Sequence, residues 1–219
     1  MIGHIAHQWR QPLSFISTTA SGISIKHECN LLKPNDIPEG MNNITKKIEY
    51  LSNTIETFRN FLKEEKQYKE VVIQDRIDIA LNITDASLKN CSIKLITNIN
   101  YENPIKTTLV VGELEEVIIN IINNAKDILV EKNIDDPWIK LDLKTDENNI
   151  IITIEDNGGG IPDNILPHIF EEYFTTKNDD NGTGLGLYMS YQIININLKG
   201  NLSVYNTSHG AKFIIKLKL

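Results

Sequence analysis

The sequence lacks the features of an exported, membrane-spanning or nucleic-acid-binding protein. Its two cysteines, Cys29 and Cys91, are far apart and form no metal-type cluster, which favours a reducing cytosol. It has no run of about twenty apolar residues, and its start has neither the basic region nor the apolar core of a signal peptide. The net charge of −7 argues against general binding to nucleic acid or to an anionic membrane, because both need a surplus of Lys and Arg.

What the sequence does contain is the composition of a globular protein. Its 219 residues suffice for one large domain or two ordinary ones, with 41% apolar and 23% charged residues. The pattern changes near residue 70, where long helical periodicity gives way to short β-rich runs. We therefore expect an α+β protein with two domains, residues 1–68 and 71–219.

The first of these domains has the pattern of a helical hairpin. Apolar residues recur at intervals of three and four on both sides of residues 33–40, which contain Pro34, Pro38 and Gly40. Because two helices bury little core, we expect a second copy to complete a dimeric four-helix bundle. The alternative is a hairpin that packs on its own C-terminal domain. The seam positions are Ile2, Ala6, Trp9, Leu13, Ile16, Ala20, Ile23, Ile44, Ile48, Leu51, Ile55, Phe58 and Leu62.

The second domain mixes strand and helix patterns, which predicts a two-layer α/β sandwich. Residues 206–210 are expected to form the turn of a final hairpin, with Gly210 supplying a positive φ. The expected strands are 93–99, 107–111, 138–143, 150–155, 202–205 and 212–217, and the expected helices are about 75–89, 113–131 and 184–197.

The helix expected over residues 113–131 carries the first polar cluster. Glu116, Asn120 and Asn124 are four residues apart and share one face, while isoleucines occupy the other. A carboxamide oxygen can bind a hard cation such as Mg²⁺ while its NH₂ group binds a phosphate. A polar face in contact with water is the simpler interpretation, but asparagine is a poor helix former and its repetition needs a reason.

Two glycine-rich segments follow. Residues 156–162 come directly after a strand, where Asp156 could accept a hydrogen bond from an exocyclic amine and the glycines permit close approach of a flat base. Residues 181–187 open a helix, so free N–H groups there could hold phosphate. Between the two segments lies a largely polar stretch with Phe170, Tyr173 and Phe174, and a loop of this length is typical of a lid or of a disordered segment.

Together these clusters resemble the histidine kinases, within the ATPase group that includes the nucleotide-binding domains of gyrase, Hsp90 and MutL. The Asn cluster resembles the N box, residues 156–160 the first glycine box, residues 170–177 the F box and residues 182–186 the second glycine box. The resemblance implies a Bergerat-type sandwich that binds ATP and Mg²⁺. It implies that Asn120 ligates the metal, Asp156 holds the adenine amine and Lys177 reaches the γ-phosphate.

The N-terminal residues 6–13 resemble the family's H box, in which the phosphorylated histidine precedes a proline by five residues. His7 and Pro12 fit this spacing, whereas His4 does not. A lone histidine on a helix usually has no special role, but the match makes His7 the expected phosphoacceptor. The expected catalytic residues are His7, Gln8, Glu116 and Lys177, and the expected nucleotide-binding residues are Asn120, Asn124, Asp156, Gly158, Gly160, Gly182, Thr183, Gly184, Gly186 and Leu187.

The resemblance implies autophosphorylation of His7 and then phosphoryl transfer to an aspartate of a response-regulator receiver, which we expect to act in trans. We expect a cytoplasmic homodimer, without nucleic acid or membrane contact in these residues. The upstream sensor and any membrane tether are expected outside them. The first alternative is a conformational ATPase of the same fold that uses Glu116, and the second is a nucleotide-binding scaffold without catalysis.

Three residues depart from the common family pattern. Gln8 stands where many members have an acid, and a carboxamide cannot act as a base near neutral pH. Gln11 stands where Thr or Asn often supports dephosphorylation of the partner, so the pattern does not predict that activity. Asp127 replaces a lysine that many members place near the phosphates. Residues 124–127 and this H box resemble the nitrogen-regulation sensor kinases.

Overall fold

The computed structural model describes residues 2–61, 67–177 and 184–219, without the side chains of residues 2–11, 49–50 and 53–61. Its contacts divide the chain into two compact units. The helical unit comprises Met1–Glu64 with Thr176–Gly182, and the sandwich unit comprises Glu65–Thr175 with Thr183–Leu219. Each unit is described by itself.

The helical unit is a hairpin of α1 (Ile2–Glu28) and α2 (Asp36–Phe61). The turn ends before Asp36, so the prediction of a break across residues 33–40 was wrong in its second half. Pro38 lies in the first turn of α2, where its missing N–H costs no helical hydrogen bond. Gly40 lies inside α2, and a Cβ there would be 2.4 Å from Cδ1 of Ile23. The glycine therefore permits close approach of the two helices instead of breaking α2.

The hairpin leaves part of its apolar seam in contact with solvent. Ile16, Ile23 and Ile44 are half-buried. Leu13 and Ile48 stay 55% and 51% exposed. An apolar side chain gains free energy when it leaves water, so these exposed positions are suited to a further contact.

The described residues of the sandwich unit form seven strands. Five form one sheet in the order β2-β4-β5-β7-β6, in which β2 and β4 are parallel and the other neighbours antiparallel. Strands β1 and β3 pair separately. The strands are β1 (Tyr68–Val72), β2 (Lys94–Asn98), β3 (Lys106–Val110), β4 (Trp138–Thr145), β5 (Asn149–Asp156), β6 (Asn201–Asn206) and β7 (Ala211–Lys218).

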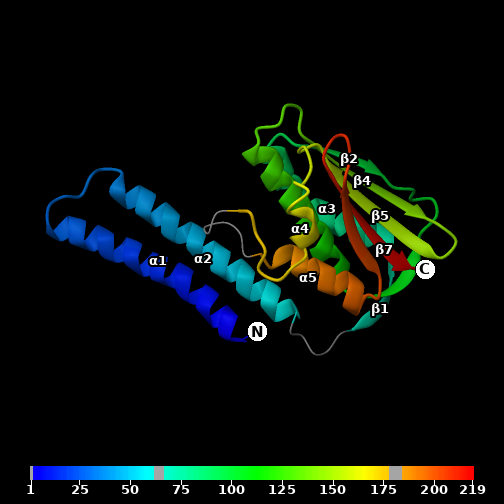
Figure 1. Cartoon of the computed structure of the whole chain (residues 1–219), viewed down its shortest axis with the longest axis horizontal. Helices are drawn as coiled ribbons and strands as arrows, with labels where there is room; N and C mark the ends of the chain where they lie inside the picture. Colours follow the sequence, from blue (N-terminus) through cyan, green and yellow to red (C-terminus); the bar gives the residue numbers. More distant parts are fainter. Residues whose placement is uncertain (1, 62–66, 178–183) are drawn as a thin grey trace. The chain divides into compact units, whose positions relative to one another are not determined.

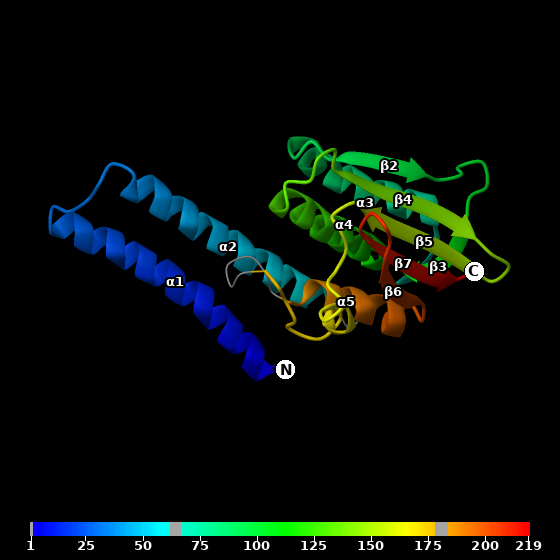
Figure 2. The same ribbon diagram turned by 45° about the horizontal axis from the view of Figure 1, so that its top comes forward.

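The helices of this unit are α3 (Ile73–Asn90), α4 (Glu113–Glu131) and α5 (Gly186–Gln192), with a 3₁₀ turn at Leu166–His168. They lie on one face of the five-stranded sheet, as two views show (Figures 1 and 2). The predicted α+β class with a two-layer sandwich is therefore confirmed. No described helix is long and apolar enough to cross a membrane.

The core lies between these helices and the sheet. Alternate residues of β5 point inward, and Ile150, Ile152 and Ile154 are buried there. The inward face of α4 is equally apolar, because Ile118 and Ile122 are fully buried. Burying side chains of this size stabilises the fold by roughly 1.5–3 kcal/mol each.

Three expectations about this unit need correction. Strand β1 was not predicted, and its five residues pair only with β3 and are mostly exposed. The helix expected over 184–197 begins at Gly186 and becomes a π-helix at Ile193–Asn197. Gly210 does not have a positive φ, so the prediction that it supplies one in the β6–β7 turn was wrong. Gly210 is instead required by close packing, described below.

Candidate functional site

The middle of α4 presents Asn120 to the beginning of α5. The Nδ2 group of Asn120 donates to Oγ of Ser190 at 2.9 Å, and this hydroxyl donates to the carbonyl oxygen of Gly186 at 3.0 Å. A Cβ on Gly186 would lie 2.5 Å from Oδ1 of Asn120. Within the described residues, no protein donor binds Oδ1 of Asn120. This oxygen is therefore an available acceptor beside a glycine.

Glu116 and Asn124 lie one helical turn before and after Asn120, on the same face of α4. Both are half-buried, whereas the isoleucines behind them are fully or almost fully buried. The predicted division of this helix into a polar face and a buried apolar face is confirmed. The buried isoleucines are Ile118, Ile121 and Ile122.

Asp156 ends β5 as a second, buried acceptor. It is only 7% exposed, and its Oδ1 accepts hydrogen bonds from the N–H groups of Gly158 at 2.8 Å and Ala211 at 3.4 Å. Burial raises the pKa of Asp156, although both hydrogen bonds and the charge of Lys132 oppose this shift. Within the described residues, Oδ2 has no hydrogen-bond partner, so it can accept an amine hydrogen from a ligand.

The glycine-rich turn after Asp156 is fixed by the hairpin of β6 and β7. The side chain of Asn206 accepts from the N–H of Ile161 at 2.8 Å and donates to its carbonyl oxygen at 2.7 Å. Gly159 and Gly160 have φ values of +80° and +79°, which favour glycine. A Cβ on Gly160 would also lie 2.7 Å from Oδ1 of Asn206. Glycine is thus required here by the fold itself.

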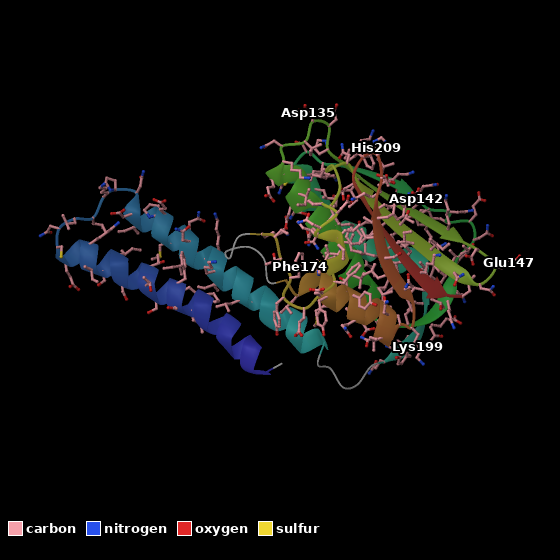
Figure 3. All side chains as sticks on the ribbon, in the orientation of Figure 1. Asp135, Asp142, Glu147, Phe174, Lys199 and His209 are labelled. Atoms are coloured by element: carbon pink, nitrogen blue, oxygen red, sulfur yellow. The ribbon has the colours of Figure 1, made fainter. Side chains whose placement is uncertain are left out.

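Gly210 and Lys132 also pack closely against Asp156 and the glycine-rich turn that follows it. A Cβ on Gly210 would be 2.2 Å from the carbonyl oxygen of Asp156 and 2.5 Å from Oδ1 of Asp156. Nζ of Lys132 donates to the carbonyl oxygen of Gly158 at 2.6 Å. Figure 3 shows His209 at the tip of the β6–β7 hairpin, where its ring meets Trp138 edge-on with centroids 5.8 Å apart. These contacts give Asp156 a rigid surrounding.

The polar segment between the two glycine boxes is held by contacts with the residues at the start of α5 and within it. The N–H of Tyr173 donates to the carbonyl oxygen of Gly184 at 3.1 Å. Tyr173 and Gly184 have φ values of +67° and +63°, and a Cβ on Gly184 would lie 2.3 Å from the carbonyl carbon of Tyr173. Phe170 packs on Tyr191 with ring centroids 5.3 Å apart. The described part of the predicted lid is therefore anchored to α5.

The comparisons with known proteins agree with this geometry. Residues 110–219 match the family model described as "Histidine kinase-, DNA gyrase B-, and HSP90-like ATPase". This chain belongs to that family. The two-component sensor PprA of Pseudomonas aeruginosa is 37% identical over 110 residues, which are 49% of this chain and 12% of the relative. The C4-dicarboxylate transport sensor protein DctB of the same species is 25% identical over 224 residues, covering 100% of this chain and 35% of the relative.

Solved structures share the fold. The histidine kinase ThkA, in a crystal structure with the response regulator protein TrrA, covers 100% of this chain and 60% of that chain, with a TM-score of 0.77 and 20% identity. The histidine kinase AdeS of Acinetobacter baumannii covers 97% of both chains, with a TM-score of 0.72 and 20% identity. The chain spans 35% or less of the curated relatives named above.

Not every predicted residue of this histidine kinase-type ATPase is placed relative to Asn120. His7 and Gln8 lie within α1, but their side chains are outside the described part. Lys177 belongs to the helical unit, so its ammonium group is not placed relative to Asn120. Gly182 and Thr183 lie outside the described residues. Leu187 is partly buried and packs against the core of the sandwich unit.

Three residues that support the ATPase site, Ser190, Asn206 and Lys132, were not predicted from the sequence. Only Ser190 has a signal in the sequence, because a serine four residues after Gly186 in a helix can donate a hydrogen bond to the glycine carbonyl. Asn206 and Lys132 reach the glycine-rich turn from 45 and 26 residues away in sequence. A contact of this kind is set by the packing of distant elements and leaves no local pattern.

The oxygen chemistry of the site suits a Mg²⁺–nucleotide. The described residues contain no group of three or more His, Cys, Asp or Glu side chains that could hold a metal ion alone. Oδ1 of Asn120 is a neutral hard ligand, of the kind that Mg²⁺ uses together with phosphate oxygens. The residues present therefore fit a metal that arrives with its nucleotide.

Proposed function

We propose that this chain is the kinase core of a sensor histidine kinase, which binds ATP in its sandwich unit and phosphorylates His7. The observation that carries the proposal is the pair of available acceptors within the compact sandwich unit. Asp156 offers a buried carboxylate oxygen, and Asn120 offers an oriented carboxamide oxygen. These are the two groups that an adenine amine and a phosphate-bound cation require.

The nucleotide would contact residues from all three clusters. Oδ2 of Asp156 would accept a hydrogen bond from the adenine amine, and Gly158 and Gly160 would let the base approach the backbone. Asn124 and Leu187 would line the site beside Asn120, with Glu116 at the catalytic end. The phosphates would lie against residues 182–186, whose glycines and Thr183 offer N–H groups.

The chemistry would be an in-line phosphoryl transfer. A neutral imidazole nitrogen of His7 attacks the γ-phosphorus as the bond from that phosphorus to the bridging oxygen breaks, and ADP leaves with the electron pair. Water takes the imidazole proton, because the carboxamide of Gln8 cannot act as a base near neutral pH. Lys177 would offset charge on the γ-phosphate, and Mg²⁺ held by the phosphates and Asn120 would add positive charge there.

The next partner we propose is an aspartate in the receiver domain of a response regulator. An aspartate oxygen attacks the phosphorus of phosphohistidine, the nitrogen–phosphorus bond breaks and the free imidazole is regenerated. The structure of ThkA with the response regulator TrrA supports this class of partner. The free thiols of Cys29 and Cys91 agree with the cytoplasmic location that we propose. The nitrogen-regulation subgroup stays a prediction.

We also propose that the chain works as a homodimer through the helical unit. Leu13, Met41 and Ile48 are 55%, 47% and 51% exposed on a hairpin that is too small for a core of its own. The same surfaces on a second copy would bury one another in a four-helix bundle.

The test is incubation with ATP labelled at the γ-phosphate, in the presence of Mg²⁺. We expect the protein to acquire an acid-labile, base-stable label that His7→Ala and Asn120→Ala both abolish. His27→Ala is the matched control, because His27 lies in the last turn of the same helix and should not alter labelling.

Two outcomes would contradict the proposal. Label that persists in His7→Ala would exclude His7 as the acceptor. Steady release of phosphate without labelled protein would favour a conformational ATPase, and nucleotide binding without either product would favour a scaffold.

A further inference from the structure

Ser190 lies beneath the proposed metal ligand, in a position that no family motif named above assigns. It is 2% exposed on α5, and it makes one hydrogen bond to its own helix and one to Asn120 on α4. Because so little of Ser190 is exposed, its hydroxyl has no direct access to a bound phosphate. Its effect on the site must therefore pass through Asn120.

A carboxamide has two different ends, and only one of them can bind a cation. Oδ1 is an acceptor and a metal ligand, whereas Nδ2 carries two hydrogens and repels a cation. Rotation by about 180° about the last side-chain bond exchanges the two ends at little cost in volume. Some neighbour must decide which end of Asn120 faces the nucleotide.

The hydrogen bonds from Asn120 to Ser190 and from Ser190 to Gly186 set the orientation of the carboxamide. The hydroxyl of Ser190 has one hydrogen, and this hydrogen is donated to the carbonyl oxygen of Gly186 at 3.0 Å. Its oxygen can then only accept, so the group that Asn120 turns toward it at 2.9 Å must be the Nδ2 amide. Oδ1 is consequently turned away from Ser190. It lies where a Cβ on Gly186 would be only 2.5 Å away, so the absent side chain at Gly186 leaves this oxygen open.

We propose that Ser190 is the positioning residue that fixes the Asn120 carboxamide with Oδ1 toward the metal and Nδ2 toward the protein. This inference rests on the proposed ATP and Mg²⁺ site. Because Ser190 is buried, water cannot replace its hydroxyl without rearrangement of α5. Loss of the hydroxyl would leave both ends of the carboxamide free to face the nucleotide.

The test compares nucleotide binding with and without the metal, by calorimetric titration of the whole chain with ADP. Ser190→Ala should raise the Mg²⁺ concentration at half-saturation about fivefold, which is the effect of one net hydrogen bond of about 1 kcal/mol. Affinity for ADP in EDTA should stay within about twofold, because the adenine end is untouched. Ser190→Thr keeps the hydroxyl and should restore most of the Mg²⁺ dependence.

Thr84→Ala is the matched control. Thr84 is also 2% exposed, and its hydroxyl bonds back to the carbonyl of Ala80 four residues earlier, at 3.1 Å, but on α3. Its loss should lower stability and leave the Mg²⁺ half-saturation unchanged. An equal change in both variants would show that Ser190 acts only through stability and would overturn the inference.

A measurement on the unmodified protein covers the case in which Ser190→Ala fails to fold. In ¹H–¹⁵N spectra, the Nδ2 hydrogens of Asn120 should exchange with water more slowly than those of the exposed Asn98. Equally fast exchange would overturn the inference. Failure of the wild type to bind any adenine nucleotide would overturn the proposed function as well, whereas Mg²⁺-coupled binding that Ser190→Ala leaves unchanged would overturn only the role of Ser190.

Discussion

The two units of this chain use their side chains in opposite ways. In the sandwich unit, the polar groups of the site are tied to neighbours by short hydrogen bonds, and the isoleucines behind them are almost fully buried. In the helical unit, Leu13 and Ile48 remain about half exposed. The proposed nucleotide site needs acceptors in fixed positions, whereas the proposed phosphoacceptor helix needs a surface that another protein can reach. The sandwich unit is therefore suited to holding a ligand in a fixed geometry, and the helical unit is suited to contact with another protein.

The largest expected difference concerns one isoleucine from each unit. Ile152 is 0% exposed in the core of the sheet, so Ile152→Ala should lower the free energy of unfolding by about 4 kcal/mol through lost burial and a cavity. Ile48→Ala, at a 51% exposed position, should cost less than about 0.5 kcal/mol within one chain. Urea unfolding measures the first effect.

Sedimentation at several protein concentrations measures the contribution of Ile48 to assembly. The dissociation constant of the proposed dimer should rise several-fold in Ile48→Ala, because an apolar side chain is lost from the interface. An unchanged dissociation constant would argue against a dimer seam at this position, whatever happens to Ile152→Ala.

Two glycines sharpen the same comparison. Gly210→Ala places a Cβ 2.2 Å from the carbonyl oxygen of Asp156, so we expect about a 100-fold loss of ADP affinity, equivalent to about 3 kcal/mol. Gly22→Ala is the matched substitution in α1, where nothing lies within 4 Å of the added Cβ. It should raise helix stability by roughly 0.5–1 kcal/mol and leave ADP affinity unchanged. Calorimetric titration and thermal unfolding of both variants check this contrast.

The smallest expected effect is a contrast in pH dependence between two aspartates. Burial raises the pKa of Asp156, so acidification should protonate it before an ordinary aspartate, and a protonated carboxyl offers the adenine amine a weaker acceptor. ADP affinity should therefore fall as the pH falls through this raised pKa. The N–H of Lys33 and the ammonium of Lys26 lower the pKa of the half-buried Asp36 by hydrogen bonding to it, so it should stay ionised to lower pH.

The signs for stability are also opposite. A raised native pKa means that ionised Asp156 costs stability, and this cost appears as the pH rises through the native value. Asp36 has a lowered native pKa, so its contribution is present at higher pH and is lost as the pH falls through the native value. Carboxyl ¹³C titrations of the two residues measure both shifts, and ADP titration of Asp156→Asn controls for protonation of the nucleotide. A lower pKa for Asp156 than for Asp36 would contradict the comparison.

Local patterns predicted much of the fold and part of the site. The four-residue spacing of Glu116, Asn120 and Asn124 fixed their common face, because helix geometry repeats at that interval. The turn of the hairpin was placed too late, since Pro38 was interpreted as a breaker although proline is compatible with the first turn of a helix. Gly210 was recognised as special for the wrong reason, because close packing on Asp156 cannot be seen in the sequence around the glycine.

By itself, the sequence determined the class of the fold and the order of the glycine and asparagine motifs. These features depend on periodicity and on residue type, which are local properties. Only the tertiary structure decided which end of the Asn120 carboxamide is free, and why Asp156 keeps an open oxygen. Both depend on Ser190 and Ala211, which come from elements distant in sequence and meet the site only when α5 and β7 pack against α4 and β5.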